Sequence, residues 1–83
     1  MIEENFIRLG QDFYLDKDDI GSVISVIIEY DYYNTLSRFD NCLLVGLFNI
    51  DGVRPKGITV FYEGKIKYIT LSKLKNVKIK FIT

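Results

Sequence analysis

Three short segments in the last third of the chain alternate apolar with polar residues, and this alternation constrains the fold more than any other feature. They are ITVFY (58–62), KIKYIT (65–70) and NVKIKF (76–81). A period of two is typical of β-strands, and each segment is too short to form a stable helix alone. Glu63-Gly64, between the first two, is a turn signal. The sequence therefore predicts a hairpin followed by a last strand.

Two upstream segments extend the β pattern. GSVISVIIEYDY (21–32) is rich in Val, Ile and Tyr, and CLLVGLFNI (42–50) is almost continuously apolar, which predicts a strand covered on both faces. Gly46 indicates a bulge or bend in that strand. Arg-Pro-Lys-Gly at 54–57 predicts a loop. We expect strands near 22–30, 42–50, 57–62, 65–70 and 76–82, with a 3₁₀ turn over LSKLK before the last strand.

The inner faces of these strands define a predicted core within a single domain of residues 1–83. A chain of this length buries only about 60–65% of the surface that its unfolded form exposes, so the core must be compact and leaves little room for a deep pocket. From the period-two alternation, we expect the core to contain Val26, Ile28, Val60, Ile66, Tyr68, Leu74, Val77 and Ile79.

The first twenty residues are open to two interpretations. NFIRL can form a strand, or IEENFIRLGQDF can form a short amphipathic helix, and we favour the strand. LDKDDIG (15–21) resembles the start of a calcium-binding loop, but it lacks the third acid, and Ile27 stands where a bidentate glutamate belongs. We expect an acidic surface turn and no metal site.

The composition argues against an enzyme. The chain has no His and one Cys, so it cannot form a His-based triad, a Cys–His pair or the usual zinc sites. Its acids lie mostly beside turn glycines and at strand ends, where carboxylates are ordinarily solvated, and we expect Cys42 to be a small core residue. No phosphate-binding glycine motif is present. We expect a non-enzymatic protein with no cofactor.

Compartment follows from the hydrophobic runs and the single cysteine. The longest apolar runs, 26–28 and 42–45, are far below the roughly 20 residues that cross a bilayer, which predicts no membrane association. A lone cysteine forms no internal disulfide, and no leader of basic, apolar and small residues opens the sequence. We therefore expect a cytoplasmic location.

Charge is divided along the chain although the total is neutral. Residues 1–51 carry ten acids and three bases, whereas residues 52–83 carry eight bases and one acid. The two halves either attract each other within the fold or form two charged surfaces. If the alternate residues of the last two strands face the core (Ile66, Tyr68, Val77, Ile79 and Phe81), the lysines between them project outward. Together with two lysines on the intervening turn they form a lysine face, which comprises Lys65, Lys67, Lys73, Lys75, Lys78 and Lys80. Such lysines either protect an edge strand from aggregation or bind nucleic acid or an acidic protein.

A second candidate surface lies in YDYYNTLSRF (30–39), which we expect to connect two strands over about eleven residues. Tyr32, Tyr33 and Phe39 are residue types that anchor protein interfaces. The alternative is that these rings fold back and cap the core. We favour a protein partner at this segment, because the neutral charge and the absence of an exposed stacking platform weigh against nucleic acid. The sequence does not predict an oligomeric state.

A family resemblance supports the same fold. In GKIKYITLSKLKNV, the turn glycine Gly64, the strand end Tyr68-Ile69 and the following Ser72 and Leu74 resemble the end of SH3-like barrels. With IGSVISVIIEY, the chain resembles, over about residues 20–80, the short SH3-like proteins of uncharacterised role in tailed-phage genomes. The resemblance implies an all-β, SH3-like barrel of five to six short antiparallel strands.

The same resemblance implies a phage-encoded protein that binds a host macromolecule in the host cytoplasm and modulates or inhibits it. EYDYYN (29–34) is similar to the ALYDY element of peptide-binding SH3 domains. However, the chain has no Trp, and Thr70 stands where those domains have proline. We therefore do not expect proline-rich recognition.

Overall fold

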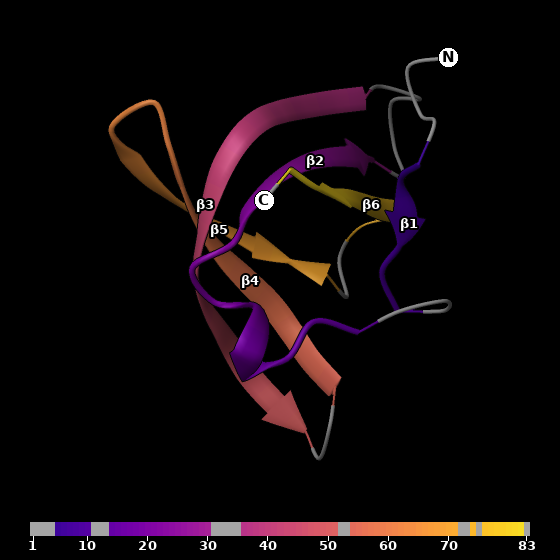
Figure 1. Cartoon of the computed structure of the whole chain (residues 1–83). Helices are drawn as coiled ribbons and strands as arrows, with labels where there is room; N and C mark the ends of the chain where they lie inside the picture. The colour runs from indigo at the N-terminus through magenta and orange to yellow at the C-terminus, as the bar shows by residue number, and fades with distance from the viewer. Residues whose placement is uncertain are drawn as a thin grey trace.

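Within the residues that the structure describes, the chain folds into one antiparallel β-sheet with a short 3₁₀ helix, η1 (Figure 1). A computed structural model describes residues 5–10, 14–30, 36–51, 54–71, 74 and 76–82. The all-β prediction is confirmed. In chain order the elements are β1 (Ile7–Arg8), η1 (Lys17–Asp19), β2 (Val23–Glu29), β3 (Leu36–Asp51), β4 (Arg54–Tyr62), β5 (Lys65–Thr70) and β6 (Asn76–Phe81).

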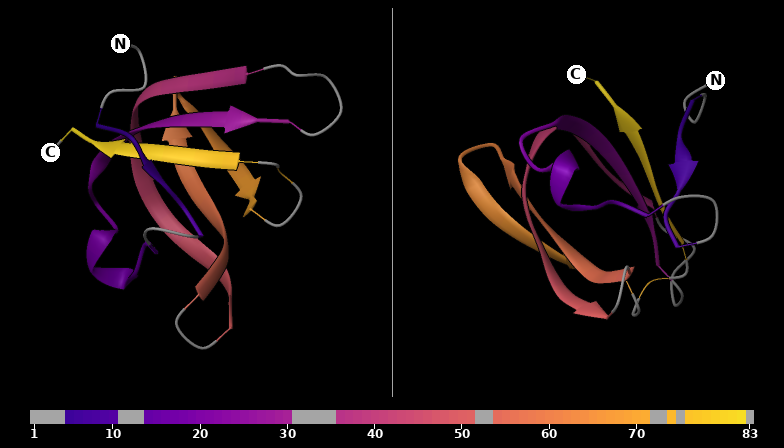
Figure 2. Two further views of the ribbon diagram at one scale, coloured as in Figure 1. Left: turned by 90° about the vertical axis from the view of Figure 1, so that its right-hand side faces the viewer. Right: turned by 60° about the horizontal axis from the view of Figure 1, so that its bottom comes forward.

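The six strands lie in the order β1-β6-β2-β3-β4-β5 and form a strongly curved sheet (Figure 2). The curvature wraps the sheet around one set of apolar side chains, so the sheet has an inner face toward the core and an outer face. Strands β1 and β5 are the two edges, and within the described residues they are not paired with each other. The sheet is therefore open between β1 and β5.

Strand β3 is the longest element and joins the two parts of the sheet. Its first half pairs with β2 and its second half with β4, and the pairing shifts register once in each half. The shifts add a residue at Asp40-Asn41 and at Val45-Gly46, so Phe39, Cys42 and Leu44 all reach the inner face despite their uneven spacing. Asn41 tolerates the φ of 56° that its bulge requires. The bulge predicted from Gly46 is confirmed.

Strands β4 and β5 form the predicted hairpin at Glu63-Gly64. Both turn residues have positive φ, 50° and 78°, which is the geometry of a type I′ turn. The two-residue turn places Tyr62 opposite Lys65 and thereby fixes the pairing of the whole hairpin.

This register overturns part of the predicted core. Because Val60 is fully buried and pairs with Lys67, Lys67 and Ile69 lie on the inner face of β5. Ile66 and Tyr68 then point outward, with 47% and 73% of their surfaces exposed, so their assignment to the core is wrong.

The rest of the predicted core lies as expected. Val26, Ile28, Val60, Val77 and Ile79 are buried, and Leu74 is partly buried against them. Cys42 is also a core residue, as predicted. The segment around η1 adds Leu15, which is 1% exposed, and is held to β3 by hydrogen bonds between Leu44 and both Gly21 and Ser22.

Strands β3 and β4 both begin earlier than predicted. β3 begins at Leu36, so the predicted eleven-residue connection is wrong: 36–39 are strand. The loop predicted at 54–57 is also wrong, because β4 begins at Arg54. Pro55 is tolerated there since β5 pairs with β4 only from Gly57 onward, and the missing N–H of Pro55 interrupts no ladder on that side.

The predictions for the first residues and for the turn before the last strand can be compared with the structure only in part. NFIRL contains the short strand β1, as favoured, which pairs with β6 through Ile7–Ile79 and Arg8–Lys78. The predicted 3₁₀ turn before the last strand lies partly outside the described residues, and Leu74 N–H donates to Leu71 C=O (3.3 Å) across it. No helix long and apolar enough to cross a bilayer occurs among the described residues.

Candidate functional site

An apolar row crosses the outer face of four strands. Val23 pairs with Leu43, Leu43 with Phe61, and Phe61 with Ile66, so the four side chains are direct cross-strand neighbours. Leu43, Phe61 and Ile66 are 38%, 43% and 47% exposed. Val45 and Tyr68 continue the patch beside this row. We call this surface the apolar face; it consists of Val23, Leu43, Val45, Phe61, Ile66 and Tyr68.

An aromatic contact borders the apolar face. Phe48 pairs with Gly57, and its ring lies over the glycine, where a Cβ would be 2.0 Å from Phe48 Cζ. The ring also meets Tyr68 edge to face, with 6.4 Å between centroids. Gly57 thus leaves room for Phe48 to lie flat on the sheet beside Tyr68.

An open hollow of about 420 Å³ lies beside β5, and residues from both faces of that strand line it. Phe39, which lines the hollow, contacts Tyr62 edge to face (5.1 Å between centroids), and Lys67 Nζ lies 5.5 Å from the centre of the Phe39 ring. The hollow is mainly apolar with one ammonium group. We call it the β5 groove; it is lined by Ile28, Tyr30, Phe39, Lys67, Tyr68, Ile69, Thr70 and Leu74.

A third surface, on the outer face of the opposite half of the sheet, is basic. Arg8 pairs with Lys78, Lys78 with Ile27, and Ile27 with Arg38, which puts three cations in one cross-strand row. Arg38 lies over the Phe6 ring at 5.4 Å. Lys80 lies in the next row, opposite Ser25. We call Arg8, Arg38, Lys78 and Lys80 the basic row.

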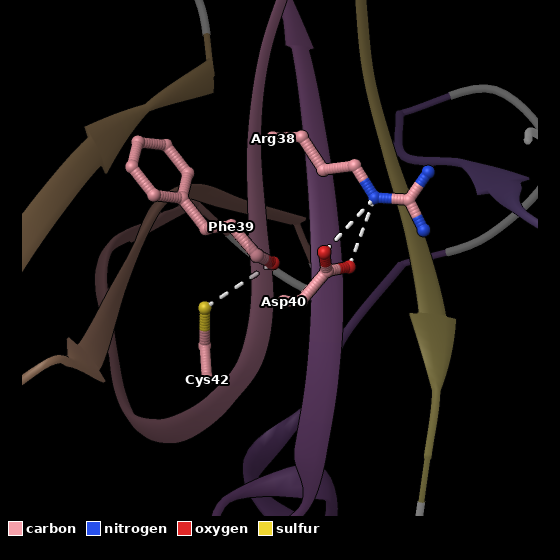
Figure 3. Close-up of polar contacts among 4 residues, drawn as sticks. All are labelled: Arg38, Phe39, Asp40 and Cys42. Atoms are coloured by element: carbon pink, nitrogen blue, oxygen red, sulfur yellow. Dashed lines mark hydrogen bonds and ion pairs between the residues drawn. The ribbon is translucent and has the colours of Figure 1, made fainter.

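The carboxylate of Asp40 reduces the charge of the basic row. Arg38 Nε donates to Asp40 Oδ1 at 2.9 Å, and both side chains project from the outer face of β3, whereas Phe39 and Cys42 project from the other (Figure 3). The hydrogen bond from Arg38 lowers the pKa of Asp40, so this carboxylate stays ionised at neutral pH. The row is therefore basic but not uniformly so.

The structure does not bring the predicted lysine face together. Lys67 lies on the inner face of β5, whereas Lys78 and Lys80 lie on the outer face of β6, four strands away in the sheet order. Lys65 shares the side of Lys67 and is exposed at the hairpin end. Lys73 and Lys75 lie outside the described residues. The basic row instead combines two of these lysines with Arg8 and Arg38.

The predicted aromatic site has only one described member. Tyr32 and Tyr33 lie outside the described residues. Phe39 lies on β3 rather than in a connection, is partly buried, and packs against the core beside Tyr62. This position agrees with the alternative in which the ring folds back on the core.

The acidic segment is a capped 3₁₀ turn. Asp16 Oδ1 accepts from the backbone N–H of Asp18 (2.9 Å), and Asp19 Oδ2 accepts from the N–H of Asp16 (2.9 Å). The carboxylates therefore satisfy backbone donors at the start of η1. Among the described residues, no three acidic or thiol side chains lie close enough to hold a metal ion.

Sequence reasoning missed the apolar face because it placed Ile66 and Tyr68 in the core. A signal was present in the hairpin itself: a two-residue turn after Tyr62 pairs Val60 with Lys67, and paired residues share a face. With Val60 inside, Ile66 and Tyr68 must point outward.

Comparison with protein-family models, with curated proteins and with solved structures gave no match for this chain. The resemblance to SH3-like phage proteins therefore depends on the sequence features alone.

Proposed function

We propose that this protein is a non-enzymatic interaction module that binds another protein through the apolar face. The observation that carries the proposal is the row Leu43–Phe61–Ile66, three adjacent large side chains that are each 38–47% exposed. Contiguous apolar patches on small proteins mark interaction sites, and aromatic residues are enriched in them. Tyr68, which is 73% exposed beside the row, is of the residue type that most often anchors an interface.

The states of the thiol and of the carboxylates in the described part of the chain support a binding role over catalysis. Cys42, the one thiol, is fully buried, and burial raises its pKa to about 11. A thiol with this pKa is almost entirely protonated at neutral pH and is a poor nucleophile. The carboxylates of Asp16, Asp19 and Asp40 are engaged in hydrogen bonds at the surface.

We also propose that the curved sheet is of the SH3-like barrel type and that the chain is phage-encoded. The resemblance over residues 20–80 supports this origin, and the succession of short antiparallel strands is compatible with it. The partner would then be a protein of the host cytoplasm. A module of this size acts by covering a partner's surface, which redirects or inhibits that partner.

Quantitative affinity capture with matched leucine variants tests the proposal. Leu43→Asp places a charge in the apolar row, whereas Leu36→Asp makes the same change at a more exposed leucine (54%) seven residues earlier on the same strand. Seven strand residues span about 23 Å. We expect one or more host proteins to be retained by wild type and Leu36→Asp and lost with Leu43→Asp.

Other results would oppose the proposal. Equal retention by all three forms would place binding elsewhere. A wild-type dimer that becomes monomeric only in Leu43→Asp, measured by sedimentation without any lysate, would make the apolar face a self-association surface instead. Far-ultraviolet circular dichroism and thermal melting establish that each variant is folded.

Nucleic-acid binding is a second candidate, favoured by the cross-strand alignment of Arg8, Lys78 and Arg38. Phosphate contacts release counterions, so binding through this row would weaken steeply with salt, by a log–log slope of about −0.9 for each contact on duplex DNA. Lys78→Glu with Lys80→Glu would abolish such binding. The neutral total charge and the Arg38–Asp40 ion pair support the protein partner over this candidate.

A further inference from the structure

Strand β5 has an open edge whose hydrogen-bonding groups can be assigned. In a hairpin with a two-residue turn, the residues next to the turn exchange both backbone hydrogen bonds. Tyr62–Lys65 is therefore such a pair, and so are Val60–Lys67 and Ile58–Ile69. The N–H and C=O groups of Ile66, Tyr68 and Thr70 consequently point away from β4. Among the described residues no strand pairs with them.

The side chains on either side of this edge differ in chemistry. Ile66 and Tyr68 lie on the outer face and belong to the apolar face. Lys65 and Lys67 lie on the other side, and Lys67 lines the β5 groove together with Ile69. A strand added to β5 would place its alternate side chains beside these two sets, since successive residues point to opposite faces.

We infer that β5 receives an extended segment of the partner protein, which pairs antiparallel with Ile66, Tyr68 and Thr70 as a seventh strand. Its apolar residues extend the apolar face beside Ile66 and Tyr68, and its acidic residues lie beside Lys65 and Lys67. Unpaired edge strands recruit peptides in this way, with backbone bonds giving affinity and alternate side chains giving specificity.

The lysines determine which strand fits. A second copy of this chain, paired through its own β5, would bring Lys65 and Lys67 of both copies to the same side of the sheet, where like charges repel. An acidic strand instead gains two ion pairs, one of them beside the partly buried aromatic ring of Phe39. This inference rests on the proposed function, because it names the form and charge of a protein partner.

A peptide matched to β5 tests the inference on the full-length protein. The probe is acetyl-Thr-Val-Val-Glu-Val-Glu-amide, whose residues in order face Thr70 back to Lys65. In two-dimensional ¹H–¹⁵N NMR titrations, we expect saturable shifts centred on the amides of Ile66, Tyr68 and Thr70, with a Kd of about 1 mM or tighter. Slowed hydrogen exchange at Ile66 and Tyr68 would accompany these shifts, since their N–H groups become bonded.

Two control peptides separate strand pairing from simple adsorption. Replacing both Glu by Lys should weaken binding at least about tenfold, because charges then repel. N-methylation of the third and fifth residues, which face Tyr68 and Ile66, removes the bonding N–H groups and should abolish the shifts. Equal shifts with either control peptide would overturn the inference, and so would no shift with the acidic peptide at about 5 mM.

A charge-reversed protein completes the test. Lys67→Glu should no longer bind the acidic peptide and should bind the Lys peptide instead. If the NMR signals of the variant away from residue 67 match those of wild type and its peptide preference is not reversed, the inference is also overturned. The outcome is independent of the Leu43→Asp capture experiment. If a host protein is lost with Leu43→Asp but no peptide binds at β5, the strand pairing alone is refuted. If Leu43→Asp retains the same host proteins as wild type, the proposed function is refuted.

Discussion

The aromatic ring of Phe48 occupies the space that a side chain at Gly57 would need. A Cβ on Gly57 would lie 2.0 Å from Phe48 Cζ and 2.3 Å from Phe48 Cε2, far inside van der Waals contact. Phe48 also forms the edge-to-face contact with Tyr68. The glycine thus fixes how the border of the apolar face is packed.

We therefore expect Gly57→Ala to lower the free energy of unfolding by about 1 kcal/mol, because the Phe48 ring must swing away from the sheet. In a Phe48→Ala background, the same change should instead stabilise by about 0.5 kcal/mol, since alanine restricts the unfolded chain more than glycine does. Urea unfolding of the four forms measures both values. The same effect of Gly57→Ala in both backgrounds would show that the ring does not lie over the glycine.

A matched pair of isoleucines tests the face assignment of the sheet. Ile79 is fully buried, whereas Ile66 is 47% exposed on the outer face. Ile79→Ala should cost about 2–5 kcal/mol through lost burial and a cavity, and Ile66→Ala less than about 1 kcal/mol. Chemical denaturation measures both. A larger loss at Ile66 than at Ile79 would mean that β5 presents its other face to the core.

The raised pKa of Cys42 predicts that the folded protein loses stability at alkaline pH. Burial raises its pKa in the folded state from 9.0 to about 11, so the unfolded chain releases this proton at lower pH than the folded chain. Its contribution to stability is complete below pH 9 and is lost as the pH rises toward 11, by about 2 kcal/mol. Tyrosines and lysines titrate in the same range, so the measurement is the difference between wild type and Cys42→Ala.

That difference in unfolding free energy should be constant from pH 7 to about pH 8.5 and then fall toward pH 11. A difference that stays flat to pH 11 would contradict burial of the thiol. Reaction of native Cys42 with a thiol reagent at pH 8 should likewise be limited by unfolding, because the side chain is fully buried.

The sequence predicted the strands well where alternation and turn chemistry coincide. β2, β5 and β6 differ from their predicted ranges by one residue or less at each end, and the Glu63-Gly64 turn is at its predicted place. Local pattern was sufficient for these bounds because turn residues and apolar runs mark where a strand begins and ends, although in β5 they do not decide which face is inside. The bulge at Gly46 was predictable for the same reason, since only the glycine interrupts an apolar run.

The prediction was wrong where pairing partners override local pattern. Ser37 to Asn41 are mostly polar, and they form a strand because they pair with β2. The bulge at Asn41 shifts the register of that pairing, so that apolar side chains before and after it reach the inner face. β5 has apolar residues at 66, 68 and 69, so neither face is distinctly apolar, and its pairing with β4 decides the orientation. The apolar face depends on that pairing, which the Glu63-Gly64 turn sets and which the alternation within β5 does not reveal by itself.

Carbene footprinting of the protein with and without its captured partner tests the central claim most directly, because it maps the surface that becomes covered. Binding through the apolar face predicts reduced labelling of Leu43, Phe61, Ile66 and Tyr68, with Leu36 and Lys78 unchanged. Reduced labelling centred on Arg8, Lys78 and Lys80, with the apolar face still labelled as in the free protein, would contradict the proposal.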